Sequence, residues 1–206
     1  ISGYEKYLPD TVYVTNYEDS NYVKICSFDN TADISNCGND VVVRVTGSDT
    51  WTIAPYERGN GGEKEDYVLS VSWEEDASPE VKVSFPGIDI TDGRICFRVA
   101  DMREDTEKMT KGLDYTVRLI DASGNMVSCH CPELVYPSLA VQLYKQDVIF
   151  GTYEYKHQLE TVMISPAKFD KGKENAFDYS DVVSMTITAN GTEAGEIIIN
   201  DIGYYE

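Results

Sequence analysis

The feature that most constrains this chain is the recurrence of short segments in which apolar and polar residues alternate. In "DYVLSVSWEE" the alternation places Tyr67, Leu69, Val71 and Trp73 on one side. Because side chains of a strand point to opposite faces in turn, the segment predicts a strand that buries Trp73 in the core. Similar segments recur between Gly, Pro, Asn and Asp residues. We predict strands at 11–15, 22–27, 40–46, 67–74, 80–85, 94–101, 114–120, 125–130, 139–145, 160–165, 181–189 and 196–204.

About a dozen strands of this length favour an all-β, two-sheet antiparallel sandwich over a small barrel. The same alternation predicts inward residues in three further strands, namely Ile95, Phe97 and Val99, then Tyr115, Val117 and Leu119, then Leu139, Val141 and Leu143. Hairpin turns are expected at 121–125 and 189–196, and a short helix or long loop at 102–112. We find no linker, so residues 1–206 are predicted to form a single domain.

The net charge disfavours two classes of partner. Lys and Arg total 17 against 36 Asp and Glu, a formal charge of −19, which opposes attraction to nucleic acid or to an anionic membrane surface. No segment has the roughly 20 apolar residues of a membrane span. The chain begins at Ile1, and we expect it to be a piece of a longer polypeptide whose targeting signal lies elsewhere.

The five cysteines form no zinc-type pair of Cys-x-x-Cys motifs. A strand places Cys129 and Cys131 on the same face, where neighbours rarely bridge each other, and the spacing of Cys26 and Cys37 allows a bridge that closes a hairpin but does not by itself indicate one. We predict mostly free, partly buried thiols.

Catalytic motifs are missing from the sequence. It contains no Gly-x-Ser-x-Gly elbow and no phosphate-binding glycine loop. His130 and His157 are interpreted as surface or packed residues, since neither belongs to a zinc-binding set. An acidic sandwich can be a glycosidase with two carboxylates across a cleft, but no strand carries acids at the required alternate positions.

The last predicted strand, "EIIINDIGYY", carries a carboxylate in an apolar run. If the strand is unbroken, Asp201 shares the inward parity of Ile197 and Ile199. A buried carboxylate then needs a cation, an arginine or backbone donors. Glu18 follows the first predicted strand, and pairing of first and last strands would bring it to Asp201 as a hard-oxygen site for Ca²⁺. The alternative is a bulge in which Asn200 and Asp201 bond to neighbouring backbone.

These same residues resemble a known family. "NYEDSN" is similar to the Phe-Glu-Asp-Gly opening of jelly-roll carbohydrate-binding modules of the galactose-binding-like type, and "GEIIINDIGYY" to their closing strand. Tyr17 and Asn200 depart from the family pattern. The resemblance implies a jelly-roll sandwich, with a structural calcium held by Glu18 and Asp201. It also implies an accessory domain of a secreted bacterial hydrolase.

Three groups of side chains are candidates for ligand binding. Trp51 and Tyr56 lie in an expected loop, and Tyr153 and Tyr155 share parity in "GTYEYKH", so either pair offers rings for stacking on sugars. A third group, on the outward side of three strands, is a row of Arg98, Arg118, Gln142 and Tyr144 that would suit an anionic sugar. The alternative for each group is ordinary surface.

Three functions follow as hypotheses. The first is a non-catalytic accessory module of an extracellular bacterial protein, which binds carbohydrate or serves as a docking and spacing domain beside a catalytic partner. The second is a jelly-roll polysaccharide hydrolase or lyase, which would need two convergent carboxyls or a Tyr, His and Arg cluster. The third is a purely structural interaction domain.

Overall fold

The computed structural model describes residues 21–28, 33–48, 50–56, 66–102, 114–131, 141–143, 154–156, 159–170, 176–190 and 194–206. Its elements in chain order are β1 (Tyr22–Cys26), η1 (Ile34–Asn36), β2 (Val42–Thr46), β3 (Thr50–Tyr56), β4 (Asp66–Trp73), β5 (Glu80–Ile88), β6 (Arg94–Asp101), β7 (Tyr115–Asp121), β8 (Met126–His130), β9 (Val141–Leu143), β10 (Glu154–Lys156), β11 (Glu160–Ile164), η3 (Pro166–Lys168), β12 (Val182–Ala189) and β13 (Gly195–Tyr205).

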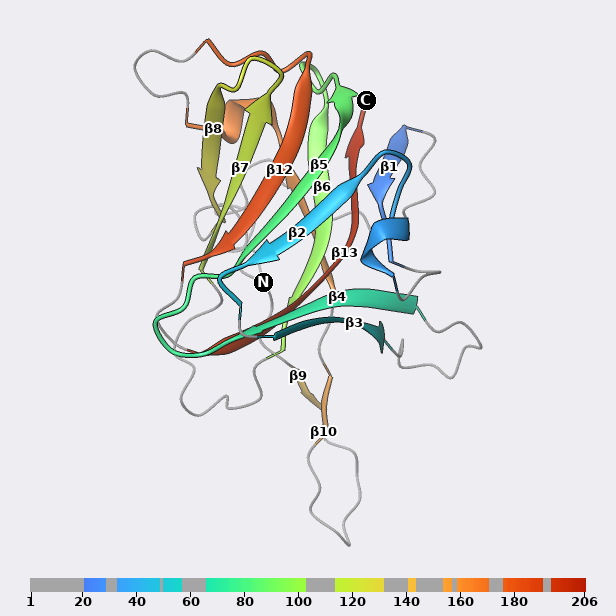
Figure 1. The fold of residues 1–206 in the computed structure, drawn as a ribbon, viewed down its shortest axis with the longest axis vertical. Coiled ribbons are helices and arrows are strands. Elements are labelled where there is room, and N and C mark those ends of the chain that lie inside the picture. The colour runs from blue at the N-terminus through green and yellow to red at the C-terminus, as the bar shows by residue number, and fades with distance from the viewer. Residues whose placement is uncertain are drawn as a thin grey trace, which may run out of the picture.

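Two antiparallel sheets form the sandwich, as the alternation predicts (Figure 1). The first sheet has the order β11-β6-β13-β4-β3, with β1 also paired to β13. The second has the order β2-β5-β12-β7-β8. A separate ribbon pairs β9 with β10. The expected strand at 11–15 and most of the expected helix at 102–112 lie outside the described residues.

The core lies between the two sheets and contains the predicted inward residues of β6 and β7 and Trp73 of β4. The side chains of Leu139, Val141 and Leu143 lie outside the described residues, and their inward direction stays a prediction. Trp73 is 4% exposed, and the Phe97 and Tyr115 side chains are almost fully buried. The Phe97 ring, from β6, meets the Tyr115 ring, from β7, edge to face at a centroid distance of 6.2 Å. This aromatic contact joins the two sheets directly, since β6 and β7 belong to different sheets.

Only one of the two expected hairpin turns is a hairpin. Residues 121–125 connect β7 to β8, and Gly124 there has a φ of +85°, the left-handed conformation that glycine adopts without strain. The segment 189–196 instead leads from β12 in the second sheet to β13 in the first, so the hairpin prediction for it is wrong. β12 pairs with β5 and β7, and β13 pairs with β4 and β6.

The carboxylate of Asp121 closes the β7–β8 turn. It accepts hydrogen bonds from the backbone N and Nδ2 of Asn125, each 2.8 Å long, and from the backbone N of Asp178 at 2.9 Å. Burial alone would raise the pKa of this carboxyl, but these hydrogen bonds outweigh it and hold the pKa below its usual range. The turn is therefore tied to the segment that precedes β12.

This lowered pKa predicts a dependence of stability on acid pH. The folded pKa of Asp121 lies below the unfolded value of about 3.9, so its stabilisation is full above that value and is lost as the pH falls through the folded pKa. Asp121→Asn should lower the free energy of unfolding by about 1.5–3 kcal/mol at pH 7 and should flatten its decline below pH 4. Urea unfolding of both proteins between pH 3 and pH 7 measures this, and equal slopes would contradict it.

Candidate ligand-binding face

The outer side of the second sheet is largely polar because its strands alternate along most of their length. On β12, Met185 and Ile187 point into the core, and Thr186 between them points outward. The register aligns outward residues of all five strands in rows that cross the sheet. We call this surface the polar face, and its polar members are Arg44, Thr46, Glu80, Lys82, Ser84, Thr116, Arg118, Ser128, His130, Ser184, Thr186 and Thr188. The apolar Val42, Ile120 and Met126 share its row with Ser84 and Ser184.

Small hydroxyl side chains occupy the middle of the polar face. Ser184, Thr186 and Thr188 are between 4% and 7% exposed, although they point away from the core. Longer side chains flank them on β5 and β7, where Lys82 and Arg118 lie on either side of Thr186 in the register. A row of hydroxyls between charged side chains is therefore the central feature of this face.

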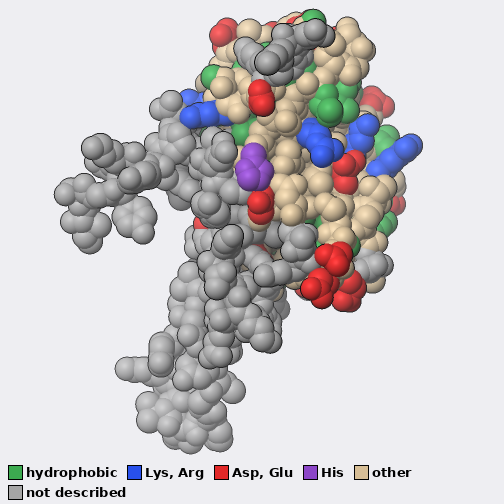
Figure 2. All heavy atoms as spheres, turned by 90° about the vertical axis from the view of Figure 1, so that its left-hand side faces the viewer, with side chains coloured by type: hydrophobic (Ala, Val, Ile, Leu, Met, Phe, Trp, Pro, Cys, Tyr) green, Lys and Arg blue, Asp and Glu red, His purple; other side chains and the backbone are tan. Residues whose placement is uncertain are grey.

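A few polar contacts organise the charged side chains of the polar face. Arg118 Nη1 lies 3.4 Å from Glu80 Oε2, and both side chains are more than a third exposed, so solvent screens this pair. His130 Nε2 lies 2.7 Å from Asp114 Oδ1, which also accepts a 3.0 Å hydrogen bond from Asn190 Nδ2. In Figure 2 the described histidine (purple) and a group of Lys and Arg side chains (blue) lie on the same side of the molecule.

The predicted row of Arg98, Arg118, Gln142 and Tyr144 does not exist as one surface. Arg98 is on β6 in the first sheet and Arg118 is on β7 in the second, so their outward directions are opposite. Gln142 is on β9, in a separate ribbon, where its backbone pairs with that of Tyr155 on β10. Tyr144 lies outside the described residues. Only Arg118 belongs to the polar face, and binding by the other members stays a prediction.

The aromatic candidates are placed differently from the expectation. Trp51 and Tyr56 belong to β3, an edge strand of the first sheet, so the prediction of a loop is wrong. Trp51 pairs with Val71 and is 44% exposed, because an edge position leaves its ring uncovered on one side. Tyr153 lies outside the described residues. Stacking of sugars on these rings stays a prediction.

Asp201 lies at a bulge in β13, so this strand is not unbroken. Asn200 pairs with Arg98 and Gly203 with Cys96, which leaves one extra residue on β13. Asp201 takes up the irregularity with a φ of +47°, and the inward position passes to Ile202, which is fully buried. The Asp201 side chain therefore does not follow Ile199 into the core.

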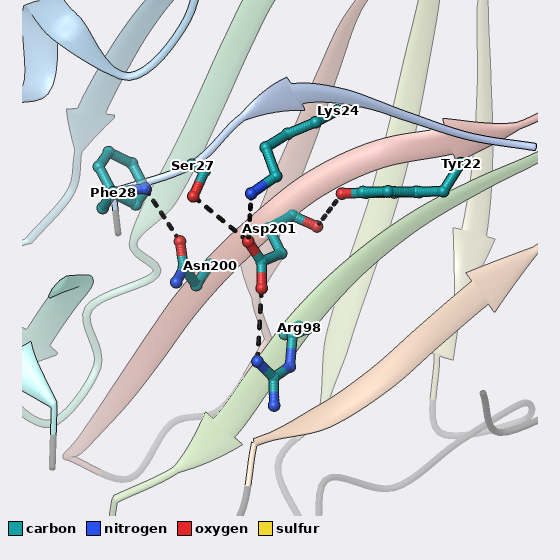
Figure 3. Close-up of polar contacts among 7 residues, drawn as sticks. All are labelled: Tyr22, Lys24, Ser27, Phe28, Arg98, Asn200 and Asp201. Atoms are coloured by element: carbon teal, nitrogen blue, oxygen red, sulfur yellow. Dashed lines mark hydrogen bonds and ion pairs between the residues drawn. The ribbon is translucent and has the colours of Figure 1, made fainter. Parts of the chain in front are cut away.

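Cationic side chains surround the Asp201 carboxylate (Figure 3). Oδ2 lies 3.4 Å from Arg98 Nη1, and Oδ1 lies 3.5 Å from Lys24 Nζ. Oδ1 also accepts a 3.3 Å hydrogen bond from Ser27 Oγ. Burial raises the pKa of the Cys96 thiol to about 12, and the Asp201 charge adds to that shift. Asp201 thus has the arginine partner that a buried carboxylate requires.

The neighbouring Asn200 ties the bulge to the chain after β1. Its Oδ1 accepts a 3.0 Å hydrogen bond from the backbone N of Phe28, a fully buried core residue. Tyr22 OH donates a 3.2 Å hydrogen bond to the backbone O of Asp201. The bulge therefore fixes β1 against β13, which agrees with the alternative of backbone bonding for Asn200.

The described surroundings of Asp201 supply cations rather than a set of oxygen ligands, and calcium at this residue stays a prediction. Ca²⁺ takes six to eight oxygen ligands, whereas Lys24 and Arg98 place positive charge against both carboxylate oxygens. Among the described residues, no group of three or more His, Cys, Asp or Glu side chains is arranged to hold a metal. Glu18 lies outside the described residues, so its pairing with Asp201 stays a prediction.

The thiols agree with the sequence interpretation. All five cysteines are free and buried. Cys129 and Cys131 lie in the same core, and the backbone N of Ser27 donates a 2.9 Å hydrogen bond to Cys37 O, which brings the segments of Cys26 and Cys37 together.

A cavity of about 390 Å³ lies beside Cys37, between β1 and the end of β5. Its lining includes Val23, Lys24, Phe85, Ile88 and Tyr204.

Sequence reasoning missed most of the polar face. The strand 181–189 is predicted nearly correctly, but the sequence does not show which strands pair with it. The hydroxyls of β12 are therefore not recognised as the middle of a surface. The available signal is the alternation of "SMTITA", which separates Ser184, Thr186 and Thr188 from Met185 and Ile187. The outward charges of β2 and β5 follow from the same parity, but their alignment requires the register.

Comparison with known proteins shows similarity of fold. No protein-family model matches the chain, and no curated protein matches its sequence. A family 30 carbohydrate-binding module from a cellulosomal cellulase of Clostridium thermocellum is 12% identical with a TM-score of 0.52, covering 90% of this chain and 96% of that chain. A family 11 module from another cellulosomal cellulase of this organism is 10% identical with a TM-score of 0.50, covering 89% and 94%.

A third similar structure is an exo-β-agarase. It is 10% identical with a TM-score of 0.54, and the match covers 90% of this chain but only 24% of the agarase chain.

None of the helices within the described ranges has the length and hydropathy that crossing a membrane requires. The chain therefore has the two-sheet β-sandwich fold of carbohydrate-binding modules, as the sequence resemblance implied.

Proposed function

We propose that this chain is a non-catalytic carbohydrate-binding module of an extracellular protein, where it lies beside a catalytic domain and holds its ligand on the polar face. The observation that carries the proposal is the set of charged side chains on β5 and β7, which flank a nearly buried row of hydroxyls on β12. Sugar hydroxyls donate and accept hydrogen bonds, so a surface of Ser, Thr, Arg, Lys and Glu offers many complementary partners. The similarity to modules of known carbohydrate-binding families supports this assignment.

A hydrolase is favoured less by the same face. Among the described members of the polar face the carboxylate is that of Glu80, which pairs with Arg118, and Asp114, which precedes β7, contacts His130. Such pairs hold side chains in place, whereas glycosidases position two carboxyl groups about 5–9.5 Å apart across a glycosidic bond. The match to about a quarter of an agarase chain also agrees with one domain of a larger enzyme.

The test is affinity gel electrophoresis of the isolated chain against a panel of plant, algal and microbial polysaccharides, combined with a reducing-sugar assay. We expect retardation by at least one polysaccharide and no release of sugar. Thr186→Phe would place a ring between Lys82 and Arg118 and should remove the retardation. Thr52→Phe, on exposed β3, is the matched control and should bind as the parent chain does. Sugar release, or full binding by Thr186→Phe, would contradict the proposal.

A further inference from the structure

Three cations share one row of the polar face. In the register Arg44 pairs with Lys82, Lys82 with Thr186, and Thr186 with Arg118. Neighbouring strands are about 4.8 Å apart, so the row runs across the strands from β2 to β7. The chain has only 17 Lys and Arg among 206 residues, and three of them lie in this one row, on β2, β5 and β7.

The pairing of Arg44 with Lys82 is unfavourable by itself. Like charges placed directly opposite each other in an antiparallel pair are destabilising. Within the described part of the chain, no hydrogen bond or ion pair holds the side chain of either residue. Arg118 has Glu80 as its partner, at 3.4 Å. A ligand that brings negative charge to this row would relieve the repulsion.

The residue between the cations is short and nearly buried, so the cations extend beyond it. Thr186 is only 4% exposed and lies between Lys82 and Arg118 in the register, so a chain lying across β12 would meet the longer Lys82 and Arg118 side chains on either side of it. The described outward residues of the polar face include no Phe, Tyr or Trp ring, and the face therefore offers mainly hydrogen bonds and charge rather than stacking. Guanidinium and ammonium groups bind carboxylates and sulfates by charge-assisted hydrogen bonds.

We propose that the ligand of the polar face is an anionic polysaccharide, whose carboxylate or sulfate groups lie between Lys82 and Arg118 and against Arg44. This inference rests on the proposed function, since it specifies the chemical class of the sugar. The net charge of −19 does not prevent binding, because exposed charges farther away than about 8 Å are largely screened at physiological ionic strength. Contacts within the row act at shorter range.

The experiment measures binding of the whole chain to matched polymers by isothermal titration calorimetry. The polymers are a polyuronate, the same polyuronate after reduction of its carboxyl groups, a sulfated galactan, and the same galactan after desulfation. We expect one anionic polymer to bind at least tenfold more tightly than its neutral counterpart. The pair that shows this difference identifies carboxylate or sulfate as the recognised group.

Variants locate the interaction. Lys82→Gln and Arg118→Gln should each weaken binding of the anionic polymer at least tenfold, whereas Arg94→Gln, on β6 of the first sheet, should leave it unchanged. Urea unfolding confirms that each variant is folded. Equal binding of both members of a pair overturns the anionic ligand but keeps the proposed function. Binding of no polysaccharide overturns both, and variants that bind fully overturn the role of this row.

Discussion

Phe97→Ala should be among the most destabilising single substitutions in the chain, lowering the free energy of unfolding by about 3–5 kcal/mol. Phe97 is fully buried on β6 and meets Tyr115 from the opposite sheet at a centroid distance of 6.2 Å. Alanine would remove the ring and leave a cavity between the sheets, because strands on both sides hold the backbone in place. Urea unfolding monitored by circular dichroism measures the change.

The matched control for Phe97→Ala is an apolar residue of the outer surface. Val42 on β2 is 52% exposed, and Val42→Ala should change the free energy of unfolding by no more than about 0.5 kcal/mol. If Phe97→Ala were as mild as this control, the two sheets would not share the core described for them.

Asp201→Ala should lower the free energy of unfolding by about 2–4 kcal/mol, because it leaves a nearly buried guanidinium without its carboxylate. The Arg98 side chain is 16% exposed, whereas Lys24 is 48% exposed, so most of the loss comes from Arg98. Alanine is also strained at the φ of +47° found here. Asp201→Gly removes the carboxylate without that strain, and should be about 1 kcal/mol less destabilising than Asp201→Ala.

A double variant separates the ion pair from other causes. Arg98→Met with Asp201→Ala removes both charges, so its loss of stability should be smaller than the sum of the two single losses. Strictly additive losses would show that the pair is not coupled. EDTA is the second control: the ion pair predicts an unchanged melting temperature. A melting temperature that EDTA lowers, and that no longer responds in Asp201→Ala, would place calcium at this residue instead.

Parity along single strands could be predicted from the sequence. The inward positions of Trp73, Phe97 and Tyr115 follow from alternation, because one face of each strand must be buried. Asp201 could not be placed this way, since a bulge adds one residue and reverses the parity after it. The sequence supplies a cue in the buried acid itself, but the choice among cation, arginine and backbone partners depends on residues distant in the chain.

Alignment between strands could not be predicted. Arg98 and Arg118 are on the outward side of their strands as expected, but the strands belong to different sheets. The strand partners of β12 and β13 were likewise unknown from the sequence, so the connection at 189–196 was predicted as a hairpin. Glycine and asparagine favour a turn both in a hairpin and in a crossover between sheets. A row of cations does exist, with Arg44 and Lys82 beside Arg118, and it depends on register across β2, β5, β12 and β7.

The central claim is that the polar face is the carbohydrate-binding surface of this sandwich. The most direct test is an NMR titration of the isotopically labelled chain with an oligosaccharide of a polymer that it binds. The claim predicts that the largest amide shift changes fall on β5, β12 and β7, around Lys82, Thr186 and Arg118. Shift changes confined to β3 around Trp51, or to the cavity beside Tyr204, would contradict it.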